Sequence, residues 1–213
     1  MRYVATVVVI AAGYYAFTKG GKALLLTGPA GAFWPGAGLG IAILYLGGLR
    51  WWPAILLGDL GSLLADVIDL GVPPASALAE AAGDMARTLV AVVILRGLVG
   101  PRIALDRLKQ VGAVLVAVAT GAAISASVAM LALRAGDVIA ASEMSVFWRS
   151  WWLGDLSGGL VVLPLALAWA RPLAPTLRGR GAWEGALMIA TVVALSAGAM
   201  SADQPLTYLV FPH

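Results

Sequence analysis

The chain has 213 residues, of which 61% are apolar and only 12% are charged, and its formal net charge is +3. A soluble domain has about 45–50% apolar and about 25% charged residues, so this composition excludes a disordered chain, a soluble Rossmann enzyme and a nucleic-acid-binding domain. We expect an all-α integral membrane protein, a polytopic helical bundle in a lipid bilayer. The chain has no Cys, and its one His is the last residue, His213. We therefore expect no disulfide, no metal site and no cofactor.

Seven apolar stretches are candidates for membrane-spanning helices, because a span needs roughly 20 predominantly apolar residues. In chain order they cover residues 3–18, 31–49, 51–71, 75–99, 110–134, 147–170 and 183–201. Short loops with Pro, Gly or charged residues separate them. The first stretch follows a single basic residue and has no clear cleavage site, so we interpret it as an uncleaved helix rather than a signal peptide.

Basic residues lie mostly in one set of loops, which sets the expected orientation of the chain. This set contains Arg2, Arg50 and the loops at 100–109 and 171–181. Because Lys and Arg gather on the cytoplasmic side of membrane proteins, we expect these loops and the N-terminus to be cytoplasmic. Seven spans would place the C-terminus outside, so we also expect the native protein to continue beyond His213 and to return to the cytoplasm.

Charged residues inside the third and fourth stretches point to a buried polar site. A charged side chain at the bilayer centre costs roughly 2.5–3.5 kcal/mol and normally faces the bundle interior or a wet cavity. Asp59 and Asp66 fall about 20° apart on one helix face. Glu80, Asp84 and Arg87 share a face of the next helix, where Asp84 and Arg87 can pair directly.

The sixth stretch supplies a second polar set, which contains Arg149, Trp151, Trp152 and Asp155. Asp155 shares a helix face with Trp151, whereas Arg149 points about 120° away. With a cytoplasmic N-terminus, these residues and Trp34 lie in the extracytoplasmic half of the bilayer. Polar groups from several helices are therefore expected at one level of the membrane.

We expect these charged groups, Arg149 included, to face the bundle interior and to line one polar cavity that opens toward the extracytoplasmic side. In this hypothesis the arginine anchors an anion, and the tryptophan rings form a flat apolar wall. Carboxylates crowded in a low dielectric cannot all ionise, so pH sensing stands beside ligand sensing. The alternative is a closed ion-pair network without a cavity. The candidate ligand-binding residues are Trp34, Asp59, Asp66, Glu80, Asp84, Arg87, Arg149, Trp151, Trp152 and Asp155.

Several stretches resemble the MASE1 domain, a membrane-associated sensor of bacterial signalling proteins. Residues 33–40 (FWPGAGLG) and 48–58 (GLRWWPAILLG) resemble its opening, and residues 147–159 (FWRSWWLGDLSGG) resemble its most specific stretch. Residues 208–212 resemble the start of its last helices, so the similarity covers essentially the whole chain. The resemblance implies a sensor of about eight helices that precedes a histidine kinase, a GGDEF/EAL or a phosphatase output. Around the fourth stretch the family often carries Asn and Glu, where this chain has Asp84 and Arg87.

We therefore interpret residues 1–213 as a single MASE1-like domain without a soluble output domain. It would be a non-catalytic sensory input module in the bacterial inner membrane that responds to a small ligand or to protons. Its expected partners are the lipid bilayer, a cytoplasmic output domain or partner protein, and a second copy in a homodimer, with no nucleic acid. The alternative is a small solute transporter that uses the same polar pocket. An intramembrane enzyme lacks a nucleophile or a metal set.

Overall fold

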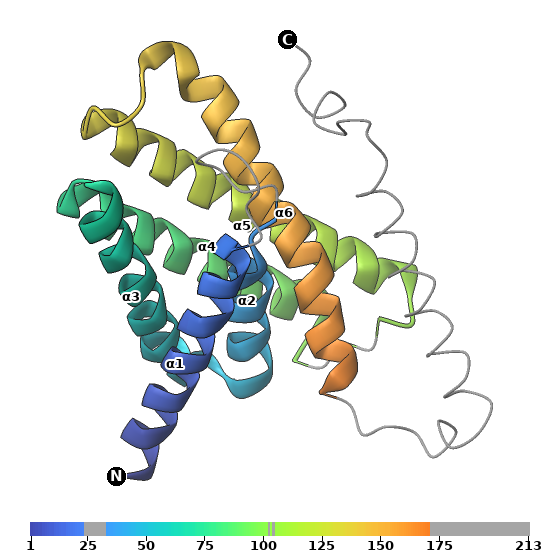
Figure 1. The fold of residues 1–213 in the computed structure, drawn as a ribbon. Helices are drawn as coiled ribbons and strands as arrows, with labels where there is room; N and C mark the ends of the chain where they lie inside the picture. Colours follow the sequence, from blue (N-terminus) through green and yellow to red (C-terminus); the bar gives the residue numbers. More distant parts are fainter. Residues whose placement is uncertain (24–32, 102, 104, 171–213) are drawn as a thin grey trace, which may run out of the picture. The chain divides into compact units, whose positions relative to one another are not determined.

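The computed structural model describes residues 1–23, 33–101, 103 and 105–170, and this part of the chain contains helices but no strand. Figure 1 shows the fold. The α-helices are α1 (Arg2–Ala23), α2 (Pro35–Gly47), α3 (Trp52–Leu70), α4 (Pro74–Val99), α5 (Leu108–Ala135) and α6 (Met144–Trp169). The short 3-10 turns η1 (Leu49–Trp51) and η2 (Ala141–Glu143) precede α3 and α6.

The all-helical class predicted from composition is confirmed, and the first six predicted stretches each correspond to one α-helix. The largest differences are at the end of α1, which extends to Ala23 rather than to residue 18, and at the start of α2, which begins at Pro35 rather than at residue 31. Proline suits the first turn of a helix, because the N–H groups of that turn have no acceptor within the helix and proline lacks an N–H. The seventh stretch at 183–201, the 171–181 loop and the 205–213 segment lie outside the described residues.

Three segments of the described chain are long and apolar enough to cross a membrane. They are Leu49–Asp69, Leu108–Ala135 and Ala141–Trp169, with 21, 28 and 29 residues. At 1.5 Å per residue the shortest of them reaches about 31 Å, the thickness of a bilayer's hydrocarbon core. Helix α4 has 26 residues, but it carries Glu80 and Asp84 in its first half and Arg87 at its middle. This helix therefore needs partners for its charges within the bundle.

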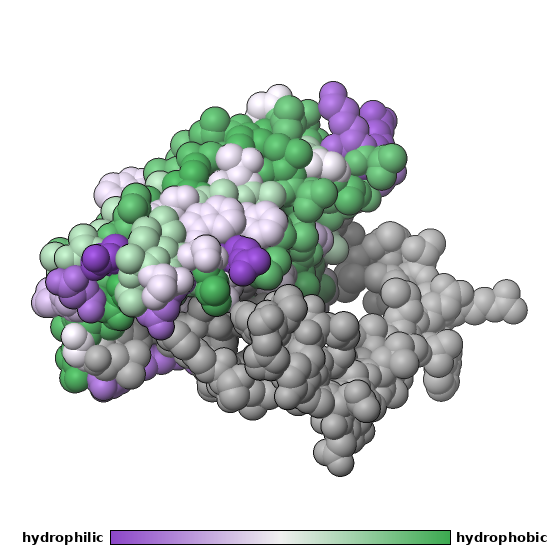
Figure 2. All heavy atoms as spheres, turned by 90° about the horizontal axis from the view of Figure 1, so that it is seen from above, coloured by the Kyte–Doolittle hydropathy of each residue, from purple (hydrophilic) through white to green (hydrophobic). Residues whose placement is uncertain are grey.

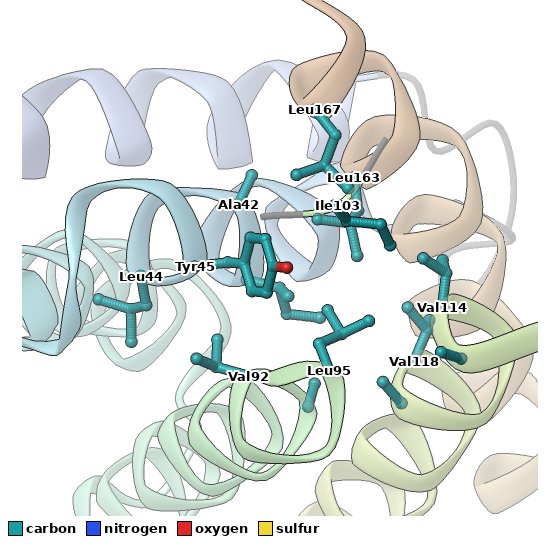
Figure 3. Close-up of a cluster of buried hydrophobic side chains, with 14 of the residues drawn as sticks. Ala42, Leu44, Tyr45, Val92, Leu95, Ile103, Val114, Val118, Leu163 and Leu167 are labelled. Carbon is teal, nitrogen blue, oxygen red and sulfur yellow. The ribbon is translucent and has the colours of Figure 1, made fainter. Parts of the chain in front are cut away.

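Helix α2 lies at the centre of the packing, in contact with α1, α4 and α6. Its buried side chains meet those of α4, α5 and α6 in one apolar cluster, which includes Leu44, Leu95, Val118 and Leu163 (Figure 3). Nine of the 13 residues of α2 are buried. This burial on all sides explains why α2 is apolar on all sides.

Glycines bring the backbones of α2 and α6 into direct contact. A Cβ atom at Gly38 would lie 2.8 Å from the Gly158 carbonyl oxygen and 2.8 Å from the Leu163 nitrogen. A Cβ at Gly158 would overlap the Trp34 carbonyl group. Any side chain at either position would therefore push the two helices apart, as expected for tightly packed membrane helices.

The outward faces of the helices are apolar. Large exposed side chains include Val8 on α1, Leu64 on α3, Leu115 on α5 and Val161 on α6. The face shown in Figure 2 is mostly hydrophobic, with hydrophilic residues in small groups near its margins. An apolar surface of this extent suits contact with lipid rather than with water.

Candidate functional site

One group of buried polar side chains lies between α3, α4, α5 and α6. We call it the Arg87 cluster, and its members are Asp59, Asp84, Arg87, Ser125 and Asp155. Each of these residues is at most 5% exposed. Burying a charged side chain in a membrane is costly, and contacts between helices offset this cost for the charged members of the cluster.

Arg87 joins its own helix to α6. Its Nη1 atom lies 2.7 Å from Asp84 Oδ1 and 2.7 Å from Asp155 Oδ2. Asp84 lies one turn earlier on α4, whereas Asp155 reaches in from α6. The Ser125 hydroxyl on α5 donates to Asp84 Oδ1 at 2.7 Å. Hydrogen bonds between charged groups are roughly twice as strong as neutral ones, so this guanidinium ties α4 firmly to α6.

Asp59 adds a third carboxyl group from α3. Its side chain is 2% exposed and lies within electrostatic range of Asp84, Arg87 and Asp155. The Arg87 cluster therefore contains three carboxyl groups and one guanidinium, an unequal set in apolar surroundings.

Several donors at the Arg87 cluster have no partner among the described residues. They are Nε and Nη2 of Arg87 and the hydroxyl of Tyr14, a residue of α1 that is 1% exposed. The Tyr14 hydroxyl lies within electrostatic range of Asp59 and of the other charged members. A Cβ at Gly58 would lie 2.9 Å from Tyr14 Cδ1, so the glycine makes room for this ring against α3.

The tryptophans of α6 bind to α5. Trp151 Nε1 donates to Ser125 Oγ at 3.1 Å, and Trp152 Nε1 donates to the Ala119 carbonyl oxygen at 3.1 Å. Trp148 stacks on Trp152 with ring centroids 5.9 Å apart. The predicted flat wall of a cavity is instead a row of half-buried rings that holds α6 against α5.

The structure brings together Asp59, Asp84 and Arg87 with Asp155, as the helix faces predicted. Glu80 is also buried, one turn before Asp84 on α4. Trp34 is half-buried at the start of α2, and its backbone N–H donates to the Gly154 carbonyl oxygen at 2.9 Å.

One charged candidate lies away from the cluster, and another cannot be assigned. Arg149 is exposed, so the expectation that it faces the bundle interior is wrong. Its position about 120° from Asp155 around α6 explains the difference. The side chain of Asp66 lies outside the described part of the structure. Sequence reasoning also missed Ser125 and Tyr14, since a neutral residue in an apolar run gives little signal.

Cavities occur away from the Arg87 cluster. One of about 270 Å³ is lined by apolar side chains of α5, of α6 and of the loop before α5, among them Val114, Leu160 and Pro164. Another of about 270 Å³ lies between α1 and α3, lined by Val8, Tyr15 and neighbouring residues. Neither is lined by a charged side chain. The Arg87 cluster contains the ion pairs that the alternative of an ion-pair network requires.

Comparison with known proteins supplies a family for this chain. A family model described as MASE1 matches residues 6–212, nearly the whole chain. None of the curated proteins compared with the chain matches it, and neither does any solved structure. Among the described residues, no group of three or more His, Cys, Asp and Glu side chains could hold a metal ion.

Proposed function

Because the chain belongs to the MASE1 family of membrane-associated sensory domains, we propose that it is a non-catalytic sensory input module of a bacterial signal-transduction protein. The observation that carries this proposal is the buried Arg87 cluster, which joins helices of the bundle through ionisable groups. Ionisable residues inside a membrane are expensive and usually functional. A sensor needs a group of this kind, whose contacts change when its chemical state changes.

We place the module in the inner membrane as a multi-pass protein with a cytoplasmic N-terminus. The basic residues Arg2, Arg50 and Lys109 support this orientation, because they lie near ends of α1, α3 and α5 that would share the cytoplasmic side. Arg50 also lies 4.9 Å from the ring of Trp51, and an aromatic residue beside a basic one is typical of the membrane interface.

A change at the Arg87 cluster would alter how α6 packs against α4. The bond between Arg87 and Asp155 exists only while both groups are charged and in place. A ligand or proton that favours one arrangement shifts the population toward it, by as much as its affinity differs between the two states. The shift would then pass along α6 to a cytoplasmic output domain or partner protein, such as a kinase or a cyclase, in a monomer or a homodimer.

The stimulus would be a small ligand or the proton. A ligand would bind in the extracytoplasmic half near the first turns of α6, where Arg149 is exposed, and near Trp34 and Glu80. A proton would bind directly to the carboxyl groups of the cluster. Arg149 and the half-buried tryptophan rings support the first stimulus, and the excess of carboxyl groups supports the second.

The test joins the chain to a diguanylate cyclase domain and measures cyclase activity in cells at several external pH values and with added small solutes. We expect activity to change with at least one condition and the change to disappear in Asp155→Asn. The matched control is Asp137→Asn, because Asp137 is an exposed carboxylate that pairs with Arg134 at 2.9 Å. Activity that ignores every condition, or a response that Asp155→Asn leaves intact, would contradict the proposal.

A further inference from the structure

We propose that the surface formed by α1, η1 and α3 binds one anionic phospholipid, with the lipid phosphate on Arg2 and Arg50 and an acyl chain in the apolar groove between α1 and α3. This lipid site is separate from the Arg87 cluster, and it does not depend on the sensory function.

The start of α1 and the turn before α3 meet at a basic end of the bundle. The Tyr3 hydroxyl donates to the Arg50 carbonyl oxygen at 2.8 Å, and the Tyr3 ring stacks on Trp51 with ring centroids 5.4 Å apart. These contacts bring Arg2, the residue before Tyr3, to the same end of the molecule as Arg50. Both arginines are exposed, so a ligand at this end can reach both of them.

Neither arginine has an acidic partner among the described residues, where the ion pairs involve other arginines. The first acidic residue in the sequence is Asp59. It is buried, and it lies about two turns into α3. Two positive charges without a negative charge beside them attract an anion.

Contacts with its neighbours hold Arg50 in place for this role. Its guanidinium carbon lies 4.9 Å from the centre of the Trp51 ring, a distance at which a cation is attracted to the face of an aromatic ring. A Cβ atom at Gly47, the last residue of α2, would lie 2.7 Å from Trp51 Cδ1. The Trp51 ring therefore contacts both α1 and α2, and it fixes the position of the guanidinium before an anion binds.

Apolar side chains beside the arginines favour a lipid over a soluble anion. Leu49 and Trp52 are 40% and 47% exposed, and Val4 on α1 is 63% exposed. Tryptophan and tyrosine rings are enriched at the headgroup level of a bilayer, and anionic headgroups attract basic residues next to membrane helices. A free phosphate would contact the arginines but would leave these apolar side chains in water.

An apolar groove continues from the basic end along the two helices. Helices α1 and α3 pack side by side (Figure 1), and the groove between them has a volume of about 270 Å³. Its lining contains no charged side chain and consists of Val8, Ala11, Ala12, Tyr15, Leu57, Gly58 and Gly61. Because alanine and glycine are small, they leave room between the helices for a chain of methylene groups.

The length of the groove fits one leaflet of a bilayer. Tyr15 lies 12 positions after Tyr3 in the sequence, which at 1.5 Å per residue is about 18 Å along α1. Half of the hydrocarbon core of a bilayer is about 15 Å thick. A lipid with its phosphate at Arg50 would therefore place an acyl chain along the whole groove.

Native mass spectrometry tests the headgroup. The whole chain in detergent micelles is titrated with phosphatidylglycerol or with phosphatidylcholine, which has no net charge. We expect phosphatidylglycerol to bind more tightly, and Arg50→Gln to weaken its binding about fivefold, the contribution of one arginine near an anionic lipid. Arg134→Gln is the control and should leave binding unchanged, because the charge of Arg134 is already paired with Asp137 at 2.9 Å. Equal binding of the two lipids, or a preference that survives when both Arg2 and Arg50 are replaced by Gln, would overturn the site.

Photo-crosslinking tests the groove. Phosphatidylglycerol with a diazirine in the middle of one acyl chain is incorporated into nanodiscs with the whole chain, and the labelled peptides are identified by mass spectrometry. We expect label on residues 8–15 and 57–61, and severalfold less label in Ala12→Leu, which fills the groove from an exposed position. Ala16→Leu is the matched control, because Ala16 is an exposed alanine of α1 that does not line the groove. Label confined to other helices, or equal label in Ala12→Leu, contradicts the proposal.

Two further measurements distinguish the lipid from other occupants. Glycerol phosphate at the same concentration should not displace phosphatidylglycerol, and displacement would assign the arginines to a soluble phosphate. The chain has no Cys, so Ala12→Cys reports whether two copies meet at the groove. A disulfide between copies would assign the groove to a second copy and overturn the lipid site. Neither result would affect the sensory function, which is tested through the Arg87 cluster.

Discussion

Two arginines of the same helix serve different purposes in this molecule. Arg87 is buried among carboxyl groups, a class of acceptor that is able to take up a proton. Arg96, further along α4, donates from Nη2 to the backbone carbonyl oxygens of Leu44 and Tyr45 at 3.1 and 3.3 Å. These carbonyls belong to the last turn of α2, where a positive charge is favoured by the helix dipole. Carbonyl groups do not titrate, so the Arg96 contact holds at any pH at which the chain is folded.

The end of the bundle around Arg96 is also held by contacts between uncharged groups. The Tyr45 hydroxyl donates to the Gly100 carbonyl oxygen at 2.6 Å. The apolar cluster of Figure 3 surrounds this tyrosine with side chains from α2, α4, α5 and α6. We infer that α2 and α4 form a fixed unit at this end, whereas the Arg87 cluster supplies the contact that can change. An arginine that binds carbonyl groups thus holds two helices together at any pH, whereas an arginine that binds carboxyl groups makes a contact that depends on whether those groups hold a proton.

The largest effect is expected from Arg87→Met. This change removes the only guanidinium of the cluster and leaves three carboxyl groups facing one another, and breaking a buried pair in this way costs about 3–5 kcal/mol. The free energy of unfolding, measured by titration with sodium dodecyl sulfate in mixed micelles, should fall by that amount. A decrease in the free energy of unfolding below about 1 kcal/mol would mean that Arg87 does not stabilise the bundle, and the comparison with Arg96 would be wrong.

Arg96→Gln should have a smaller effect of a different kind. The loss of the bonds to the α2 carbonyls should cost about 1–2 kcal/mol, and the cost should be the same at low and high pH. If the cost of Arg96→Gln differed between low and high pH, the division into a fixed and a variable end would be wrong.

A pair of tryptophan variants separates the Arg87 cluster from ordinary helix packing. Trp151→Phe and Trp152→Phe each remove one N–H donor at 3.1 Å, so each should cost about 0.5–1.5 kcal/mol. Only Trp151 contacts Ser125, which in turn holds Asp84. We therefore expect the effect of Trp151→Phe on the free energy of unfolding not to add to that of Asp84→Asn, and the effect of Trp152→Phe to add to it. Equal behaviour of the two variants would exclude a role for Trp151 in the cluster.

The smallest effect is expected from Arg149→Gln. Because Arg149 is exposed, the free energy of unfolding should change by no more than about 0.5 kcal/mol. A loss above about 1 kcal/mol would mean that Arg149 has a buried partner and would contradict the exposed position that the structure gives it.

The helices could be predicted because their signals are local. Apolar runs separated by Pro, Gly and charged residues placed six helices close to their observed positions, and Pro74 begins α4 one residue before the predicted stretch. The burial of Asp59, Asp84, Arg87 and Asp155 could also be predicted, since a charge in a membrane helix must find partners. What the helix faces left open was whether these groups would line a cavity or pair with one another.

The errors and omissions have physical causes too. Arg149 was assigned to the interior although its direction on α6 differs from that of Asp155, and the end of a helix lets a long side chain reach the surface. Ser125 and Tyr14 carry no charge, so their burial costs little and leaves no mark in the sequence. The proximity of Asp59 to Asp84 depends on how α3 packs against α4, which no pattern within a single helix determines.

A double-mutant cycle between Arg87 and Asp155 tests the central claim most directly. Arg87→Met, Asp155→Asn and the double variant are compared with the unchanged chain through their free energies of unfolding in mixed micelles. If Arg87 holds α4 to α6 through Asp155, the effects of the single variants will not add, with a coupling energy of about 1–3 kcal/mol at low pH. Single-variant effects that add to within about 0.3 kcal/mol would show that the two side chains act independently and would contradict the account.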